Sequence, residues 1–240
     1  MLSLASWWNK RGNRFARLGR IRKLWRSRRT RMQEVEIRVF MYELVAQSWA
    51  MHHSATQLYE AQSAPVIDRD DLMFLAAQSM LTTGALISKI LVPSQGIRRP
   101  DGCRCPVNAE EQEQHERMVK RCKELRKALG YGKGGIPAIL QQRKVRNGFE
   151  HFDARLDDFF ASSNLLIVDR YVGPVDRLIE RDGKTIAVAM RRLDPDARTA
   201  NVLDDSISLE ELSDAVIDVG KRAQQWLDGR AKPLTDLPAE

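Results

Sequence analysis

Arg146, Asn147 and His151 are the closely spaced residues of this chain that are best suited to chemistry. A histidine near its ordinary pKa accepts and donates protons at neutral pH. The planar guanidinium of an arginine matches phosphate oxygens and can stabilise negative charge that develops on them. No other window of the sequence offers as many groups able to bind a phosphate or move a proton. The sequence therefore predicts a site for phosphate chemistry in this window.

These three residues fall on a helix that the sequence predicts from Pro137 to about Ala161. The apolar stripe of this helix recurs at intervals of four and three residues and consists of Val145, Phe149, Phe152, Leu156 and Phe159. At about 100° per residue, the side chains of residues 146, 147 and 151 lie about 100°, 200° and 240° from Val145. We therefore expect all three on the sides and back of the helix, away from its core.

Two interpretations of this polar face remain open. It can be ordinary solvated helix surface, on which Glu150 pairs with Arg146 four residues earlier for a few tenths of a kcal/mol. It can also be a site that a second surface completes, such as another helix or a second copy of the protein. Gly148 favours the second interpretation, because a glycine inside a helix costs about 1 kcal/mol relative to alanine. A close backbone approach by a partner would explain why a glycine is tolerated there.

The positive charge of the chain is concentrated in an arm, residues 1–31. The arm contains eleven Lys or Arg and no acidic residue, which leaves 28 basic and 32 acidic residues in the rest of the chain. Trp8, Phe15, Leu18 and Trp25 are spaced so that they lie near one side of a helix. Such an arm could bind a phosphate backbone or an anionic membrane surface, or be only a solvated or non-native extension. The candidate binding residues are Arg17, Arg20, Arg22, Lys23, Arg26, Arg28 and Arg29.

The composition of the chain is that of a soluble globular protein, with 43% hydrophobic and 30% charged residues. Three cysteines, an odd number, do not suggest a disulfide framework, so we expect a reducing cytoplasm. The best candidate for a membrane-spanning segment, Leu81–Val92, is short and contains Lys89. The sequence therefore predicts no transmembrane helix.

Cys103, Cys105, His115 and Cys122 form a nominal set of four zinc ligands. However, the C-x-C spacing differs from the two to four intervening residues of most structural zinc sites. His115 and Cys122 also lie seven residues apart on one predicted helix. We therefore expect three reduced thiols and neither a metal nor another cofactor, with a zinc site as the alternative.

Hydrophobic periodicity predicts helices at about 33–61, 71–91, 109–129 and 137–161, and a last helix after Ser208. Asn108 and Ser208 each begin a capping box, and Gly130 is a typical C-terminal stop. Short strands are expected at about 165–172, 185–190 and 199–203. The predicted fold is mainly α. It is an antiparallel bundle of about five helices in a single domain, residues 32–240, with a small antiparallel β insertion at about 164–204 before the last helix.

The segment from Arg146 to His151 resembles the R-N-x-x-x-H form of the R-x(4–6)-H motif of the HEPN superfamily (higher eukaryotes and prokaryotes nucleotide-binding domains). The resemblance covers about residues 68–161. It implies a helical bundle with the motif on a late helix, and in many members a metal-independent ribonuclease whose two motifs meet across a dimer interface. By this resemblance, Arg146 would contact the scissile phosphate, His151 would act as general acid or base, and Asn147 would orient them.

The function that this resemblance implies is an endoribonuclease that cleaves RNA by attack of a ribose 2′-OH and works as a homodimer. A role as a toxin or defence effector, with a cognate inhibitor protein, would follow from the family. We then expect His151→Ala and Arg146→Ala each to abolish cleavage without unfolding the chain, and EDTA to have no effect. The alternative is a non-catalytic interaction or regulatory protein that uses its arm to bind RNA, an anionic membrane or a partner protein.

Overall fold

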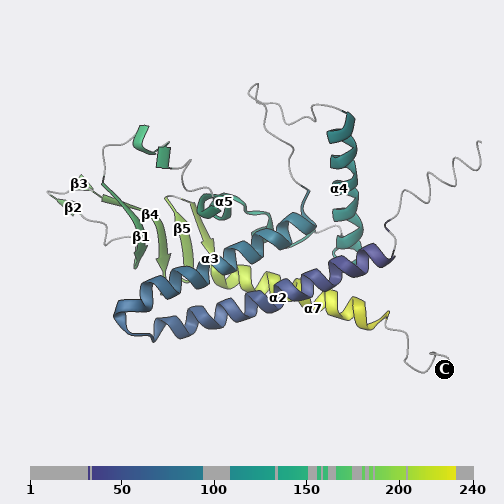
Figure 1. The fold of residues 1–240 in the computed structure, drawn as a ribbon, viewed down its shortest axis with the longest axis horizontal. Coiled ribbons are helices and arrows are strands. Elements are labelled where there is room, and N and C mark those ends of the chain that lie inside the picture. The colour runs from purple at the N-terminus through teal and green to yellow at the C-terminus, as the bar shows by residue number, and fades with distance from the viewer. Residues whose placement is uncertain are drawn as a thin grey trace, which may run out of the picture. The chain divides into compact units, whose positions relative to one another are not determined.

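The structure is a computed structural model that describes residues 32, 34–93, 109–132, 135–150, 156–157, 159–161, 166–174, 180–181, 184–185, 187–203 and 205–230. The chain divides into two units, residues 1–37 and 38–240. In the first unit, the described part is Met32 and the opening residues of a helix. The second unit holds the remaining elements, and most of the described residues are helical, as predicted (Figure 1).

Three long helices supply most of the buried apolar side chains: α2 (Glu34–Gln62), α3 (Val66–Leu91) and α7 (Leu209–Asp228). The helix predicted over 33–61 has an apolar stripe that includes Met41, Leu44 and Trp49, and this stripe is only partly buried. Met41 and Leu44 are fully buried, as expected, but Trp49 is 70% exposed. A 29-residue helix with apolar residues on more than one side can bury only the side that its neighbours cover.

Glycine allows two close helix contacts with α7. A Cβ on Gly84 of α3 would lie 2.9 Å from Cδ1 of Leu212 in α7. A Cβ on Gly220 of α7 would lie 2.2 Å from the side chain of Ser48 in α2. A side chain at either position would force a neighbour to move, so α7 packs closely against both α2 and α3 (Figure 1).

Helix α3 is the helix among the described residues that is long and apolar enough to cross a membrane, over Ile67–Leu91. Of its most apolar window, 61% is buried inside the protein. Met73, Leu81 and Ile87 are each at most 2% exposed. This burial is the behaviour of a core helix.

Helix α4 (Ala109–Ala128) ends as the sequence predicts. Gly130 adopts φ +76°, and the N–H of Tyr131 donates to the carbonyl of Arg126 at 2.9 Å. This is the hydrogen bond of a Schellman-type helix end, in which glycine takes the left-handed position without strain. The capping residue predicted at the other end, Asn108, lies outside the described residues.

The single helix predicted over 137–161 is wrong. The chain instead forms a short 3-10 helix, η1 (Ala138–Gln141), and after a break a separate helix, α5 (Lys144–Glu150). Gln142 is extended, with φ −73° and ψ 108°, and this break allows both Leu140 of η1 and Val145 of α5 to be buried. Residues 151–155 and 158 lie outside the described residues, and residues 156–157 and 159–161 are helical.

The β region is a mixed sheet, and the predicted antiparallel sheet is wrong. Its strands are β1 (Leu166–Val172), β4 (Ala187–Asp194), β5 (Thr199–Val202) and β6 (Asp205–Ser208), in the order β1-β4-β5-β6 (Figure 1). Strands β4, β5 and β6 are antiparallel neighbours, but β1 pairs with β4 in parallel, with Leu166 opposite Ala187. The 14 residues between β1 and β4 return the chain to the starting end of β1. Parallel pairing requires such a crossover.

A small ribbon lies within this crossover. Strands β2 (Glu180–Arg181) and β3 (Lys184–Thr185) pair antiparallel, with Arg181 opposite Lys184. The sequence merged β3 and β4 into one strand at 185–190. The β region also extends four residues beyond the predicted boundary at 204, because β6 pairs with β5.

The capping box that begins α7 is confirmed. The hydroxyl of Ser208 accepts a hydrogen bond from the backbone N–H of Glu211 at 3.1 Å. Leu212, Val216 and Val219, which recur at helical spacing, are fully buried. A local cap and a clear helical period therefore sufficed to predict this element.

Candidate functional site

Arg146 is 1% exposed and is one of the largest fully buried side chains among the described residues. Its guanidinium donates to the carbonyl oxygen of Gly84 in α3 at 2.7 Å and to that of Leu140 in η1 at 3.0 Å. Its Nε also donates to the carbonyl of Gln142 at 2.8 Å, and its Nη2 contacts the same oxygen. The expectation that Arg146 lies on the outer side of its helix is therefore wrong.

The physical reason is that helix α5 is covered on two sides. Val145 and Phe149 form its apolar stripe and are 5% and 4% exposed, as predicted. A second side, about 100° away, meets the backbone of α3 and η1, where carbonyl oxygens are available as acceptors. A buried guanidinium is tolerated when such acceptors satisfy its N–H groups. In this arrangement, Arg146 acts as an anchor between three segments.

Asn147 and Lys144 lie on the open side of α5. Asn147 is exposed, and Lys144 forms an ion pair with Asp205 of β6 at 3.5 Å while its side chain stays 81% exposed. Residues three apart on a helix are neighbours, so these two side chains share one exposed face. His151 lies outside the described residues, and the structure therefore brings together only part of the predicted site.

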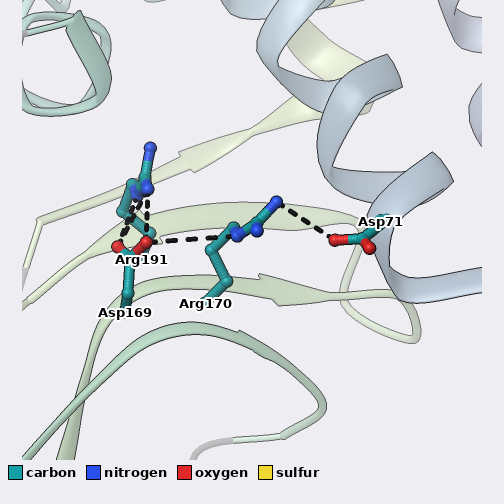
Figure 2. Close-up of polar contacts among 4 residues, drawn as sticks. All are labelled: Asp71, Asp169, Arg170 and Arg191. Atoms are coloured by element: carbon teal, nitrogen blue, oxygen red, sulfur yellow. Dashed lines mark hydrogen bonds and ion pairs between the residues drawn. The ribbon is translucent and has the colours of Figure 1, made fainter.

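Asp71, Asp169, Arg170 and Arg191 form a chain of charged contacts (Figure 2). Arg191 of β4 lies with its guanidinium carbon 6.0 Å from the ring centre of Phe149. Its Nη2 donates to Oδ2 of Asp169 at 2.7 Å and its Nε to Oδ1 at 3.0 Å, across the parallel strand pair. Arg170 lies 3.1 Å from Asp71 of α3 and 4.0 Å from Asp169. These contacts connect α5, the sheet and α3.

The two arginines of this cluster differ in exposure. The Arg191 side chain is 12% exposed, and two of its nitrogens bind the carboxylate of Asp169. Such a two-nitrogen ion pair is strong and stabilises the fold. The Arg170 side chain is 51% exposed, and its ion pairs are exposed and therefore weak. Asp169 and Arg170 lie in the strand predicted at about 165–172, and an adjacent acid and base in this apolar run was the signal that the sequence offered.

The zinc alternative gains no support from the described part of α4. The thiol of Cys122 is buried and donates to the carbonyl of Ile90 at 3.3 Å, and burial raises its pKa. Cys103 and Cys105 lie outside the described residues. Within the described ranges, no group of three or more His, Cys, Asp or Glu side chains could hold a metal ion.

A half-buried aromatic cluster lies at the end of α4. The hydroxyl of Tyr131 donates to Asp218 of α7 at 3.1 Å, and Arg222 donates to the same carboxylate oxygen at 2.7 Å. The pKa of Tyr131 is raised above its ordinary value, first by burial and then by the negative charge of Asp218. With the guanidinium of Arg222 4.8 Å from the Tyr131 ring centre, this cluster ties the end of α4 to α7.

The remaining predicted binding residues, those of the arm, lie outside the described residues. Comparison with models of protein families, with curated proteins and with solved structures finds no match for this chain. The function of α5 and of the charged cluster beside it therefore has to be inferred from the side chains that they present. These comprise a buried anchoring arginine, an exposed face with an amide and an ammonium, and a half-exposed guanidinium linked to the same helix through Arg191.

Proposed function

We propose that this protein is a metal-independent endoribonuclease of the HEPN type that works as a homodimer. The observation that carries the proposal is the R-N-x-x-x-H sequence of residues 146–151, which begins on helix α5 with Asn147 facing solvent. The helical part would then be a bundle of the kind found in that superfamily. A cytoplasmic location, a toxin or defence role and a cognate inhibitor protein belong to the same proposal.

The reaction that these residue types suit is transesterification of RNA. The ribose 2′-oxygen attacks the adjacent phosphorus, the P–O5′ bond breaks, and the products carry a 2′,3′-cyclic phosphate and a 5′-hydroxyl. One group removes the 2′-OH proton and another protonates the departing O5′. His151 of each of two chains can fill these two roles, which is why one histidine per chain suits a composite site on a two-fold axis.

The buried position of Arg146 changes its role in this proposal. A guanidinium that donates to Gly84, Leu140 and Gln142 would have to break these hydrogen bonds to reach a phosphate. We assign Arg146 as a positioning residue that holds α5, and therefore the start of the motif, against α3. The cation beside the phosphate would then be Lys144, which shares the exposed face with Asn147.

The test is cleavage of a labelled single-stranded RNA by the full-length chain in the presence of EDTA. The proposal expects cleavage that leaves 2′,3′-cyclic phosphate ends and that His151→Ala abolishes. His53→Ala is the matched control, because His53 is an exposed histidine on α2. Lys144→Ala and Asn147→Ala are expected to slow cleavage without lowering stability. Cleavage that needs a metal ion, or full activity of His151→Ala, would refute the proposal.

A second candidate function is a non-catalytic RNA-binding or interaction protein. The observation that favours it is again Arg146, whose guanidinium is already bound to backbone carbonyls and serves the fold. In that case the basic arm would provide the binding. RNA binding would weaken steeply with salt, vanish when residues 1–31 are removed, and persist unchanged in His151→Ala.

A further inference from the structure

A pocket of about 460 Å³ lies among α2, α3, α7 and the turn between β4 and β5. Its volume is within the range of small-molecule sites in proteins. None of the described α5 side chains, Lys144 and Asn147 included, lines it. The residues that form its apolar floor come from three elements and are nearly fully buried: Met73, Met80, Leu193 and Leu209. Methionine side chains adapt to ligands of different shapes.

The rim of the pocket carries an excess of negative charge. Asp194, Asp196, Glu210 and Asp214 line it, and Arg198 is the one cation among the described residues of the lining. Arg198 and Glu210 form an ion pair at 2.8 Å and largely cancel each other. The carboxylate of Asp194 accepts two backbone N–H groups of its own turn, at 3.1 and 2.9 Å. Two carboxylates, those of Asp196 and Asp214, are left without a hydrogen bond or ion pair to the described residues.

An aromatic ring completes the wall. Tyr59 of α2 lines the pocket and is 74% exposed, so its ring is available to a ligand. The face of a tyrosine ring attracts a cation, and it does so more strongly where water is partly excluded. Carboxylates and an aromatic face around an apolar floor therefore favour one kind of ligand, a cation attached to an apolar body.

An anion is the opposite possibility, because the N-terminus of α7 opens beside the pocket. The positive end of the α7 dipole is already neutralised by side chains of the protein. Ser208 accepts the N–H of Glu211, and both Glu210 and Glu211 place negative charge in the first turn. A phosphate or carboxylate would meet these acids together with Asp214, so the electrostatics oppose an anion.

We propose that this pocket binds an organic cation, with its ammonium or guanidinium group between Asp196, Asp214 and the ring of Tyr59. The apolar part of the ligand lies over Met73, Met80 and Leu193. Because the rim is acidic, RNA phosphates are repelled from this surface. The inference therefore stands or fails independently of the proposed ribonuclease activity.

The test uses the full-length chain and three probes of the same shape in saturation-transfer NMR. Tryptamine carries the cation, 3-ethylindole is uncharged, and indole-3-propionate carries an anion. The proposal expects tryptamine to bind most tightly, the neutral probe more weakly and the anion least. Added salt should weaken tryptamine binding and leave the neutral probe unchanged. Equal binding of the cation and anion, or no binding of tryptamine, would overturn the proposal.

Two sets of variants locate the binding. The double variant Asp196→Asn with Asp214→Asn should weaken tryptamine about fivefold, since two exposed ion pairs each contribute little. The matched control, Glu110→Gln with Glu124→Gln on α4, removes the same charge away from the pocket and should have no effect. Ala55→Phe fills the pocket from α2 and should abolish binding of both tryptamine and 3-ethylindole. Unchanged tryptamine binding in either the double variant or Ala55→Phe would also overturn the proposal.

Discussion

Replacing Arg146 by alanine removes a side chain that joins α3, η1 and α5. In the structure, the guanidinium donates to the carbonyls of Gly84, Leu140 and Gln142 and is 1% exposed. The substitution takes away every one of these donors at once. It also leaves a cavity where the largest buried side chain of this region lay. We therefore expect Arg146→Ala to destabilise the folded chain.

The size of the effect follows from the number of hydrogen bonds. A hydrogen bond to a charged group contributes about 1.5–3 kcal/mol, so three acceptors set an upper range of several kcal/mol. The carbonyl of Gly84 lies within α3 and keeps its helical hydrogen bond, and water can enter the cavity, which reduces the loss. We expect the free energy of unfolding to fall by about 3–5 kcal/mol, as when one partner of a buried charged network is removed. That is a large part of the 5–15 kcal/mol typical of a domain.

The assay is equilibrium unfolding in urea, followed by tryptophan fluorescence and circular dichroism. The free energy of unfolding usually falls by about 1–3 kcal/mol per molar urea. With a value near the upper end of this range, the urea concentration at the unfolding midpoint should fall by about 1–2 M. Lys144→Ala is the matched control, because Lys144 is the neighbouring basic residue on α5 and its side chain is 81% exposed. The control should change stability by less than about 0.5 kcal/mol.

An Arg146→Ala variant as stable as Lys144→Ala would contradict the anchoring role of Arg146. If that stable variant also lost RNA cleavage, Arg146 would be free to act on a phosphate, as the sequence predicts from the motif. Destabilisation with residual cleavage by the folded fraction would instead support the anchoring role. Stability and activity therefore have to be measured on the same preparation.

Three further predictions concern the rest of the fold. Gly84→Ala places a Cβ 2.9 Å from Leu212, and we expect a loss of about 1–3 kcal/mol from overpacking in urea unfolding. Ser208→Ala removes the side-chain cap of α7 and should cost about 1 kcal/mol in the same measurement. Burial, and then Asp218, raise the pKa of Tyr131 in the folded chain. The protonated hydroxyl therefore contributes to the free energy of unfolding fully below about pH 10, the ordinary pKa of tyrosine. This contribution is lost as pH rises toward the folded pKa. Stability should therefore fall with pH in this alkaline range, and less steeply in Tyr131→Phe.

The elements that the sequence predicted correctly are those with local signals. The hydroxyl of Ser208 and the N–H of Glu211 are three residues apart, so the capping box at α7 depends on neighbours alone. Gly130 ends α4 for a similarly local reason, since the left-handed conformation favours glycine. Strand β1 agrees with its apolar run to within one residue.

The features that the sequence missed depend on distant segments. The apolar stripe around Val145 predicts that α5 is buried on one side only. In the structure, α3 and η1 also cover Arg146 on a second side. Trp49 belongs to the predicted stripe of α2 but is 70% exposed, since periodicity does not say which face finds a partner. The parallel pairing of β1 with β4 depends on the path of the crossover, which periodicity does not report.

The candidate site itself was predicted only in part. The sequence identified the helix and the exposed Asn147, but it placed Arg146 on the wrong side. It gave no reason to connect Arg191 with this helix, because the contact with Phe149 joins residues 42 positions apart. Such contacts arise only when the sheet packs beside α5, so they require the tertiary structure.

The most direct test of the proposed function is the cleavage of a labelled RNA by the full-length protein in EDTA, with His151→Ala and His53→Ala measured in parallel. The proposal predicts products with 2′,3′-cyclic phosphate ends from the unaltered chain and from His53→Ala, and none from His151→Ala. Equal cleavage by all three proteins, or no cleavage by the unaltered chain unless a metal ion is added, would contradict it.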